Sequence, residues 1–156
     1  MCTVPKGKMK FVNVTDKNFE DIFEVSAKYE QWEYVKHHIF DMVNNYAAII
    51  NQEYLPIPFL VYENNNIIGF VQINYFERKS LYEICKLIVH ETEQSKGYGT
   101  KAIQLFMDYV KKKPLGEADG IVLSVVEGNN VALKLYESFG FKVIGEDKYG
   151  HIAMRH

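Results

Sequence analysis

The spacing of apolar positions along the chain predicts a mixed α/β protein. Short, mostly apolar runs rich in β-branched and aromatic residues predict strands at residues 9–14, 59–62, 67–75, 81–89, 121–126, 141–149 and 151–154. Apolar residues three and four positions apart predict helices at residues 15–28, 35–51, 100–110 and about 130–139. We expect Pro56 and Pro58 to end the second helix, and Gly140 to end the last one.

The order of these elements predicts how the sheet is connected. A polar turn at residues 63–66 joins two strands, with Gly69 indicating a bulge, and a charged turn at residues 77–79 leads to the next strand. These three strands should form an antiparallel meander. The strand at 81–89, the helix at 100–110 and the strand at 121–126 should form a right-handed βαβ unit. A hairpin around Tyr149 and Gly150 should close the sheet.

Composition narrows the class of protein. With 156 residues, 47% of them hydrophobic, the chain should form one domain over residues 1–156. A net charge of −2 implies no general affinity for nucleic acid or anionic membranes, and no run is apolar enough to span a bilayer or serve as a signal peptide. We therefore expect a cytoplasmic protein. Cys2 and Cys85 form no disulfide or metal pattern, and we expect Cys85 to be buried.

A glycine-rich bend is the first candidate site. The polar turn at residues 90–96 leads from a strand to Gly97 and Gly99, and a helix follows at once. The N-terminus of a helix presents unpaired backbone N–H groups and the positive end of its dipole, which together bind anions, phosphates above all. A side chain at either glycine would keep a bulky diphosphate away from the backbone.

Two motifs resemble those of the GNAT N-acetyltransferase superfamily. The hexapeptide QSKGYG, residues 94–99, resembles the Q/R-x-x-G-x-G/A motif, with Gln94 where arginine is more usual. Residues 129–141 match every fixed position of the second motif, N-x-x-A-x-x-L-Y-x-x-x-G-F. The resemblance implies the GNAT fold: a mixed, mostly antiparallel sheet of about six to seven strands flanked by about four helices. A G-x-G-x-x-A dinucleotide fingerprint also matches, but seven residues separate its glycines from the strand, and only one βαβ unit is present.

The resemblance also implies acetyl-CoA as co-substrate and assigns residues to it. Tyr136 would protonate the departing thiolate, with simple packing as the alternative. Apart from the resemblance, Glu83 alternates with Cys85 and Leu87 on the cofactor strand and is a candidate general base, with Glu33 and Glu24 as further options. Asn129 would contact the cofactor or only cap its helix. The expected cofactor-binding residues are Leu87, Ile88, Val89, Gln94, Ser95, Lys96, Gly97, Tyr98, Gly99, Thr100, Asn129 and Ala132.

The acceptor is expected to be a small primary amine. Residues 25–35 and the run LYESFGFKVIGE are similar to bacterial spermine/spermidine acetyltransferases, which implies a polyamine. Glu24 and Glu33 are candidates to hold its charges. A protein N-terminal amine, an aminoglycoside, or acyl-CoA binding without catalysis remains open, as does a homodimer. No metal set is predicted, and His37 and His38 are expected to lie at the surface.

Overall fold

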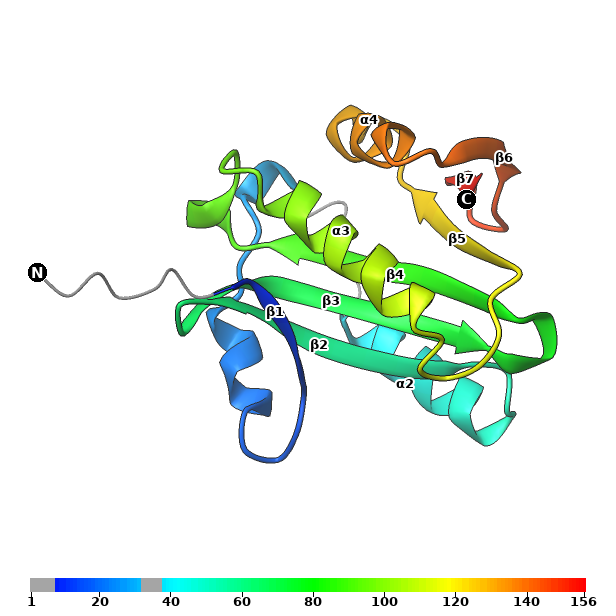
Figure 1. Cartoon of the computed structure of the whole chain (residues 1–156), viewed down its shortest axis with the longest axis horizontal. Helices are drawn as coiled ribbons and strands as arrows, with labels where there is room; N and C mark the ends of the chain where they lie inside the picture. The colour runs from blue at the N-terminus through cyan, green and yellow to red at the C-terminus, as the bar shows by residue number, and fades with distance from the viewer. Residues whose placement is uncertain (1–7, 32–37) are drawn as a thin grey trace, which may run out of the picture.

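A single seven-stranded sheet organises the molecule, with helices on both faces (Figure 1). The computed structural model describes residues 8–31 and 38–156. The strand order is β1-β2-β3-β4-β5-β7-β6, and every neighbouring pair is antiparallel except β4 and β5. The predicted mixed, mostly antiparallel sheet is therefore confirmed. Its strands are β1 (Lys10–Asn13), β2 (Leu55–Glu63), β3 (Asn66–Phe76), β4 (Leu81–Val89), β5 (Gly120–Val125), β6 (Lys142–Glu146) and β7 (Ile152–Arg155).

The predicted meander is β2, β3 and β4, but β2 begins earlier than expected. The expectation that Pro56 and Pro58 end the second helix is wrong: that helix ends at Ile50, and both prolines lie inside β2, beyond the residues that pair with β1. The bulge predicted near Gly69 is present, because the register with β2 shifts between Val61 and Tyr62. Gly69 also passes very close to β4: a Cβ there would lie 2.1 Å from the carbonyl oxygen of Ile88.

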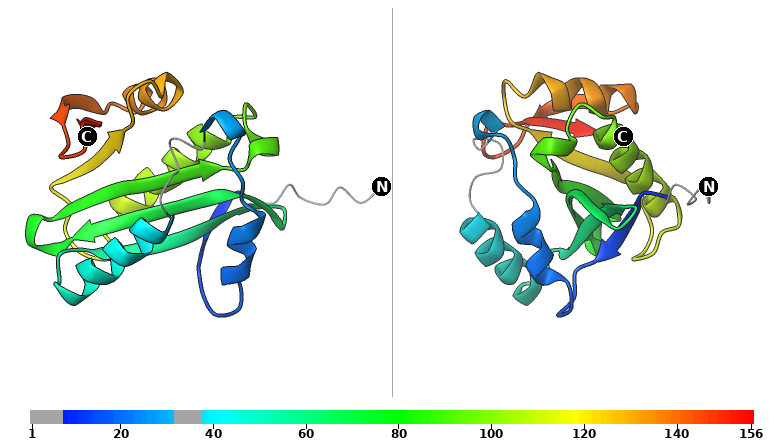
Figure 2. Two further views of the ribbon diagram at one scale, coloured as in Figure 1. Left: turned by 180° about the vertical axis from the view of Figure 1, so that it is seen from behind. Right: turned by 90° about the vertical axis from the view of Figure 1, so that its left-hand side faces the viewer.

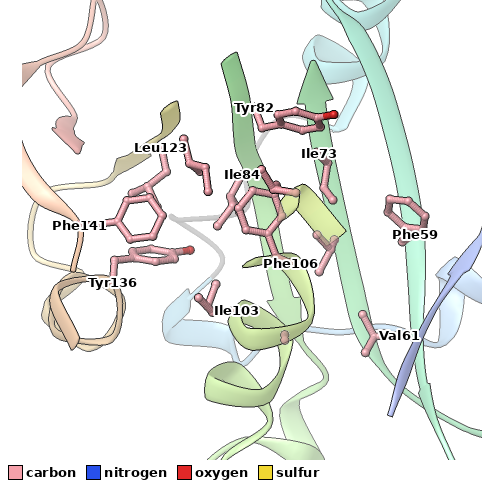
Figure 3. Packing of buried hydrophobic residues seen from close by; sticks show 14 of the residues in the cluster. Phe59, Val61, Ile73, Tyr82, Ile84, Ile103, Phe106, Leu123, Tyr136 and Phe141 are labelled. Carbon is pink, nitrogen blue, oxygen red and sulfur yellow. The ribbon is translucent and has the colours of Figure 1, made fainter. Parts of the chain in front are cut away.

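The βαβ unit is also confirmed. Helix α3 (Tyr98–Lys111) connects β4 to the parallel strand β5. The apolar residues that α3 buries, Ala102, Ile103, Phe106 and Val110, pack on the sheet and form the main core (Figure 3). Helix α4 (Asn130–Ser138) follows β5 and adds Tyr136 to this core. Gly140 follows α4 with φ of +91°, the left-handed conformation expected of a residue that ends a helix.

The parallel pairing of β4 and β5 stops halfway. Leu81 to Ile84 pair with Gly120 to Leu123, and beyond that point β4 pairs only with β3 while β5 pairs with β7. Figure 1 shows β5 turning away from β4 toward α4. The strands therefore form a V with Ile84 and Leu123 at its closed end.

The opposite face of the sheet carries α2 (His38–Ile50). The left view of Figure 2 shows α2 in front of β2 and β3, on the side of the sheet away from α3. Polar side chains of the sheet lie beneath it. Gln72 and Asn74 are buried there at 6% and 2% exposure, the two polar residues among the buried described side chains. None of the described helices is long and apolar enough to cross a membrane.

Two further expectations differ from the structure. Residues 15–28 do not form one helix: 3₁₀ turns at Phe19–Glu24 and Tyr29–Gln31 flank an extended stretch. The backbone of Ser26 bonds outside its own segment, because its N–H donates to His90 Nδ1 (3.1 Å) and its carbonyl accepts from Glu91 N–H (2.8 Å). Cys85 is exposed rather than buried, because the register of β3 against β4 shifts there: Ile73 pairs with Ile84, Gln72 with Lys86, and Cys85 is the extra residue.

Candidate functional site

The open part of the V holds a cavity of about 800 Å³. One wall is the free edge of β4 at Leu87, Ile88 and Val89, and the other is the first half of α4. The unpaired edge of β4 leaves backbone N–H and C=O groups available to an extended ligand with amide groups, as in the addition of a strand. The remaining expected residues that line the cavity are Gln94, Ser95, Gly97, Tyr98, Gly99, Thr100, Asn129, Ala132 and Tyr136.

The glycine-rich bend closes one end of this cavity. Ser95 and Gly97 adopt the left-handed conformation, with φ of +62° and +81°, which turns the chain sharply into α3. The first α-helical bond runs from Lys101 N–H to the Gly97 carbonyl (3.2 Å), so the N–H groups of the three preceding residues have no intrahelical partner. A Cβ at Gly97 would meet no atom within 4 Å. The bend thus presents bare backbone donors to open space.

Gly99 has a different surrounding from Gly97. A Cβ built there would lie 3.3 Å from Cδ2 of Leu135 on α4. This is tighter than ordinary van der Waals contact, so Gly99 sets how closely α3 and α4 approach at the mouth of the cavity. The sequence indicated only that both glycines leave room for a ligand.

Two side chains of the bend anchor it to the sheet. Gln94 Nε2 donates to the Val89 carbonyl (3.0 Å) and to Gln31 Oε1 (2.7 Å), while Gln94 Oε1 accepts from Gln31 Nε2 (3.0 Å). The Tyr98 hydroxyl donates to Glu63 at the end of β2 (2.6 Å), and this hydrogen bond is the main reason that the pKa of Tyr98 rises to about 12. The bend is therefore held at both of its ends.

Tyr136 projects from α4 into the other end of the cavity. Its side chain is 8% exposed, and its ring packs edge-to-face on Phe141 with ring centroids 5.9 Å apart. Figure 3 shows its hydroxyl pointing away from α4, across the gap toward α3 and β4. Burial raises its pKa to about 12. A phenol in this position stays protonated at neutral pH and can donate a hydrogen bond or a proton to a group in the cavity.

Asn129 serves as the helix cap that its position predicted. Its side-chain oxygen accepts a hydrogen bond from Ala132 N–H (3.2 Å), which satisfies one donor of the first turn of α4. Asn129 also borders the cavity, so capping and ligand contact are compatible.

Glu83 lies on the α2 side of β4, one residue before the closed end of the V. Asn74 Nδ2 donates to Glu83 Oε2 (2.7 Å), and Asn74 Oδ1 accepts from Gln72 Nε2 (2.9 Å). Gln72 exchanges two further hydrogen bonds with Asn45 of α2. We call Asn45, Gln72, Asn74 and Glu83 the polar layer. Burial raises the pKa of Glu83, and the Asn74 hydrogen bond partly offsets this rise.

Three predicted site residues, Lys96, Glu24 and Glu83, do not line the cavity, and a fourth, Glu33, lies outside the described residues. The ammonium group of Lys96 pairs with Glu93 (3.1 Å). Glu24 borders a second cavity of about 470 Å³ beside Asp21 and His90. Glu83 lies far from both Glu24 and the bend. It is six residues before Val89, so about 20 Å of strand separates it from the end of β4 that these two features border. Glu33, with His37, falls outside the described residues.

Sequence reasoning missed one side of the cavity. The segment that precedes α2 contributes Ala27, Lys28, Glu30 and Gln31 to its lining. These residues carry no motif, and they are brought to the bend by the Gln31–Gln94 pair and the contacts of Ser26. Only the pattern of tertiary contacts identifies them.

The cavity suits a long ligand with a phosphate group at one end and amide groups along its arm. The bend offers N–H groups and a helix dipole that suit a phosphate, and the free edge of β4 offers backbone groups that suit amides. The Tyr136 hydroxyl adds a proton donor to the same cavity. Acetyl-CoA has these features, and its thioester supplies an activated acetyl group. The residues present therefore fit this co-substrate.

Solved structures with the same fold include several acetyltransferases. The PaiA N-acetyltransferase of Thermoplasma acidophilum in complex with coenzyme A is 19% identical, with a TM-score of 0.66 over 95% of this chain and 98% of that one. The aminoglycoside acetyltransferase AAC(6')-Ib in complex with coenzyme A is 18% identical, with a TM-score of 0.73 over 96% and 94%. The spermidine N-acetyltransferase of Vibrio cholerae with coenzyme A and spermine is 19% identical, with a TM-score of 0.67 over 94% and 92%.

At these identities the similarity shows a shared fold. No curated protein matches the sequence. The model of one family does match it, from residue 19 to residue 141, a range that contains the bend, both walls of the cavity and Tyr136. The chain therefore belongs to the acetyltransferase (GNAT) family, whose members are N-acetyltransferases that use acetyl-CoA.

Proposed function

We propose that the protein transfers the acetyl group of acetyl-CoA to a primary amine of a polyamine such as spermidine or spermine. The observation that carries this proposal is the polar layer, which lies under α2 and ends at Glu83, beside the point where β4 and β5 separate. A multiply charged amine needs carboxylate and amide oxygens along its path to the thioester.

The hydrogen bonds of the polar layer fix how Glu83 is presented. Gln72 Nε2 donates to the side-chain oxygens of both Asn45 and Asn74, so the amide of Asn74 turns its NH₂ group to Glu83. A carboxylate that accepts this bond on Oε2 keeps Oε1 for another donor. Cys85, two residues further along β4, is exposed, so solvent reaches β4 close to Glu83.

In the reaction we propose, Glu83 accepts a proton from the substrate ammonium group, directly or through a water molecule. The freed amine attacks the thioester carbonyl, a new C–N bond forms and the C–S bond breaks. Tyr136 supplies the proton that the leaving thiolate takes up. The alkylammonium group, with a pKa near 10.4, must lose its proton before it can attack. The positioned phenol donates a hydrogen bond, and then the proton, as negative charge develops on the departing sulfur.

The charges left on the polyamine would lie near the carboxylate of Asp41, because Glu83 is neutral once it has accepted the proton. Asp41 of α2 forms an ion pair with Lys86 of β4, close to the polar layer. Glu24 was the other candidate that the structure describes, but it borders the second cavity near Glu93, which also lines the bend end of the main cavity. We therefore assign the acceptor to the α2 side of β4 and use Glu24→Gln as the comparison variant.

The test is a thiol-release assay with acetyl-CoA and four acceptors: spermidine, spermine, kanamycin and a peptide with a free N-terminus. We expect release with the two polyamines, at a rate that rises with pH as the attacking amine deprotonates. The KM for spermidine should rise with ionic strength, because salt screens its attraction to the carboxylates. Replacing Asp41 with Asn should raise that KM, whereas Glu24→Gln should leave it unchanged.

Each alternative has its own result. Release with kanamycin or the peptide alone would replace the polyamine by that acceptor. No release with any amine, together with normal binding of acetyl-CoA, would indicate an acyl-CoA-binding domain without transfer. A KM that responds to Glu24→Gln and not to Asp41→Asn would move the acceptor to the second cavity.

A further inference from the structure

Helix α2 turns its apolar side chains to solvent. Met42, Val43, Tyr46, Ile49 and Ile50 are spaced by three and four residues, as on the buried face of an amphipathic helix. Their exposures are nevertheless 65%, 59%, 67%, 52% and 63%. We call these five residues the α2 stripe. Figure 2 shows α2 on the outside of the sheet face opposite α3, where no described element covers it.

The inner face of α2 is polar. Asn45 hydrogen-bonds Gln72, Asp41 pairs with Lys86, and Ala48, at 2% exposure, is the buried apolar residue among the described side chains of α2. Helices of folded domains gain most of their stability by packing an apolar face on other elements. In this helix the larger apolar face has no such packing within the described chain.

We propose that the α2 stripe is the contact face of a homodimer, in which α2 of one copy packs antiparallel on α2 of a second copy about a twofold axis. Tyr46 lies at the centre of the stripe, four residues from Met42 and four from Ile50, so the axis passes close to it. In such an interface the same patch meets itself. This inference is independent of which amine is acetylated.

The size of the stripe fits a dimer. At the exposures given above, the five side chains present on the order of 600 Å² of surface per chain, against roughly 800 Å² per partner in a stable interface. Ala47 and Asn51, which are also exposed on α2 and just after it, lie beside the stripe and enlarge the contact. A monomer seldom leaves an apolar patch of this size uncovered.

The charge pattern favours a second copy over other partners. Residues 42–52 contain no charged side chain, so two copies of the helix meet without repulsion between like charges. Helices that lie on membranes usually carry Lys or Arg on their polar face, and residues 38–53 contain neither. The same lack of basic residues argues against nucleic acid.

The first measurement is the mass of the full chain in solution by sedimentation velocity, over a wide range of concentration. We expect twice the 18.2 kDa of one chain. Tyr46→Glu should reduce this to a single chain, because it buries two like charges at the axis. The matched control is Ile144→Glu, at an apolar side chain on β6 with 61% exposure, and it should stay dimeric. Circular dichroism confirms that both variants are folded.

Mixing opposite charges distinguishes a second copy from any other partner. Tyr46→Glu and Tyr46→Lys should each be monomeric alone, and a mixture of the two should recover the dimer. A wild-type chain that stays monomeric at every concentration would overturn the proposal. A dimer that survives Tyr46→Glu, or that is lost equally with Ile144→Glu, would place the interface on another face and overturn it as well.

Discussion

Burial gives the two proposed catalytic side chains opposite roles. Desolvation disfavours the charged form of an acid, so it raises the pKa of both Tyr136 and Glu83. The phenol stays protonated across the working pH range, as a proton donor must. The ordinary pKa of a carboxyl group is much lower than that of a phenol, and the hydrogen bond from Asn74 limits how far burial raises the pKa of Glu83. Glu83 can therefore still ionise and act as a base. The same physical effect therefore suits both functions.

Replacing Tyr136 with Phe should lower turnover about tenfold or more and leave acetyl-CoA binding unchanged, because the hydroxyl acts as the thiolate departs. The measurement combines steady-state thiol release with calorimetric titration of acetyl-CoA. Tyr109→Phe, at a tyrosine of α3 that packs on Phe59 outside the cavity, is the matched control and should change neither quantity. Unchanged turnover in Tyr136→Phe would reduce Tyr136 to a packing residue.

Replacing Glu83 with Gln should separate activity from stability. The folded chain binds the Glu83 proton more tightly than the unfolded chain, so this group favours folding at low pH, and that contribution is lost as pH rises from 4.5 through the raised pKa. The neutral amide of the Glu83→Gln variant avoids the loss. We expect this variant to melt at the same or a higher temperature than the wild-type chain at pH 7, while turnover falls by roughly a hundredfold.

The pH profile of the wild-type enzyme gives a second measure of Glu83. Acetyl transfer should decline as pH falls through the raised pKa of this carboxyl group, and the decline should be absent from the residual activity of Glu83→Gln. A profile with the same acid limb in both proteins would assign the base to another residue.

At the scale of helices and strands, the sequence predicts those elements whose ends depend on residues close to them in the chain. The two motifs locate α3, α4 and the bend because glycine conformations and helix caps depend on neighbouring residues, as at Gly97 and Asn129. The helix predicted at residues 15–28 is absent for the opposite reason. The backbone of Ser26 forms hydrogen bonds with residues 90 and 91, which lie far away in the sequence. The exposure of Cys85 likewise follows from a register shift between two strands.

The close approach of β3 to β4 at Gly69 is possible only because glycine has no side chain. A Cβ would lie 2.1 Å from the Ile88 carbonyl oxygen, so Gly69→Ala must push β3 and β4 apart. We expect it to lower the free energy of unfolding by about 1–3 kcal/mol in urea titrations. The control is Gly145→Ala, where a Cβ meets nothing within 4 Å and only the cost of its φ of +140° applies. A larger loss for Gly145→Ala than for Gly69→Ala would contradict this reading of the contact.

At the scale of the whole molecule, the cavity exists because distant segments meet. The segment around Gln31, strand β4, and β5 with helix α4 come from the first, second and last thirds of the chain. The sequence predicted most residues of the cavity through family motifs, yet it contained no sign of the polar layer. Gln72 and Asn74 alternate with apolar residues on β3 as ordinary surface residues would, and only the position of α2 buries them.

Because acetyl-CoA binds the native chain, it should raise the melting temperature. At about one hundred times its dissociation constant the gain is about 2.7 kcal/mol. Gly99→Val should lose this gain, since a larger side chain there presses on Leu135 and fills the mouth of the cavity. Scanning calorimetry with and without acetyl-CoA measures it. A normal gain in a folded Gly99→Val variant would show that the bend does not hold the ligand.

The most direct test of the site is residue-resolved amide hydrogen exchange with and without acetyl-CoA. Without it, N–H groups at the free edge of β4, among Leu87, Ile88 and Val89, and in the first turn of α3, among Tyr98, Gly99 and Thr100, should exchange quickly, because nothing in the described chain pairs with them. Acetyl-CoA should slow exchange in both groups together. Protection confined to the second cavity, around Ile67 and His90, or protection of neither group, would contradict the placement of acetyl-CoA between β4 and α4.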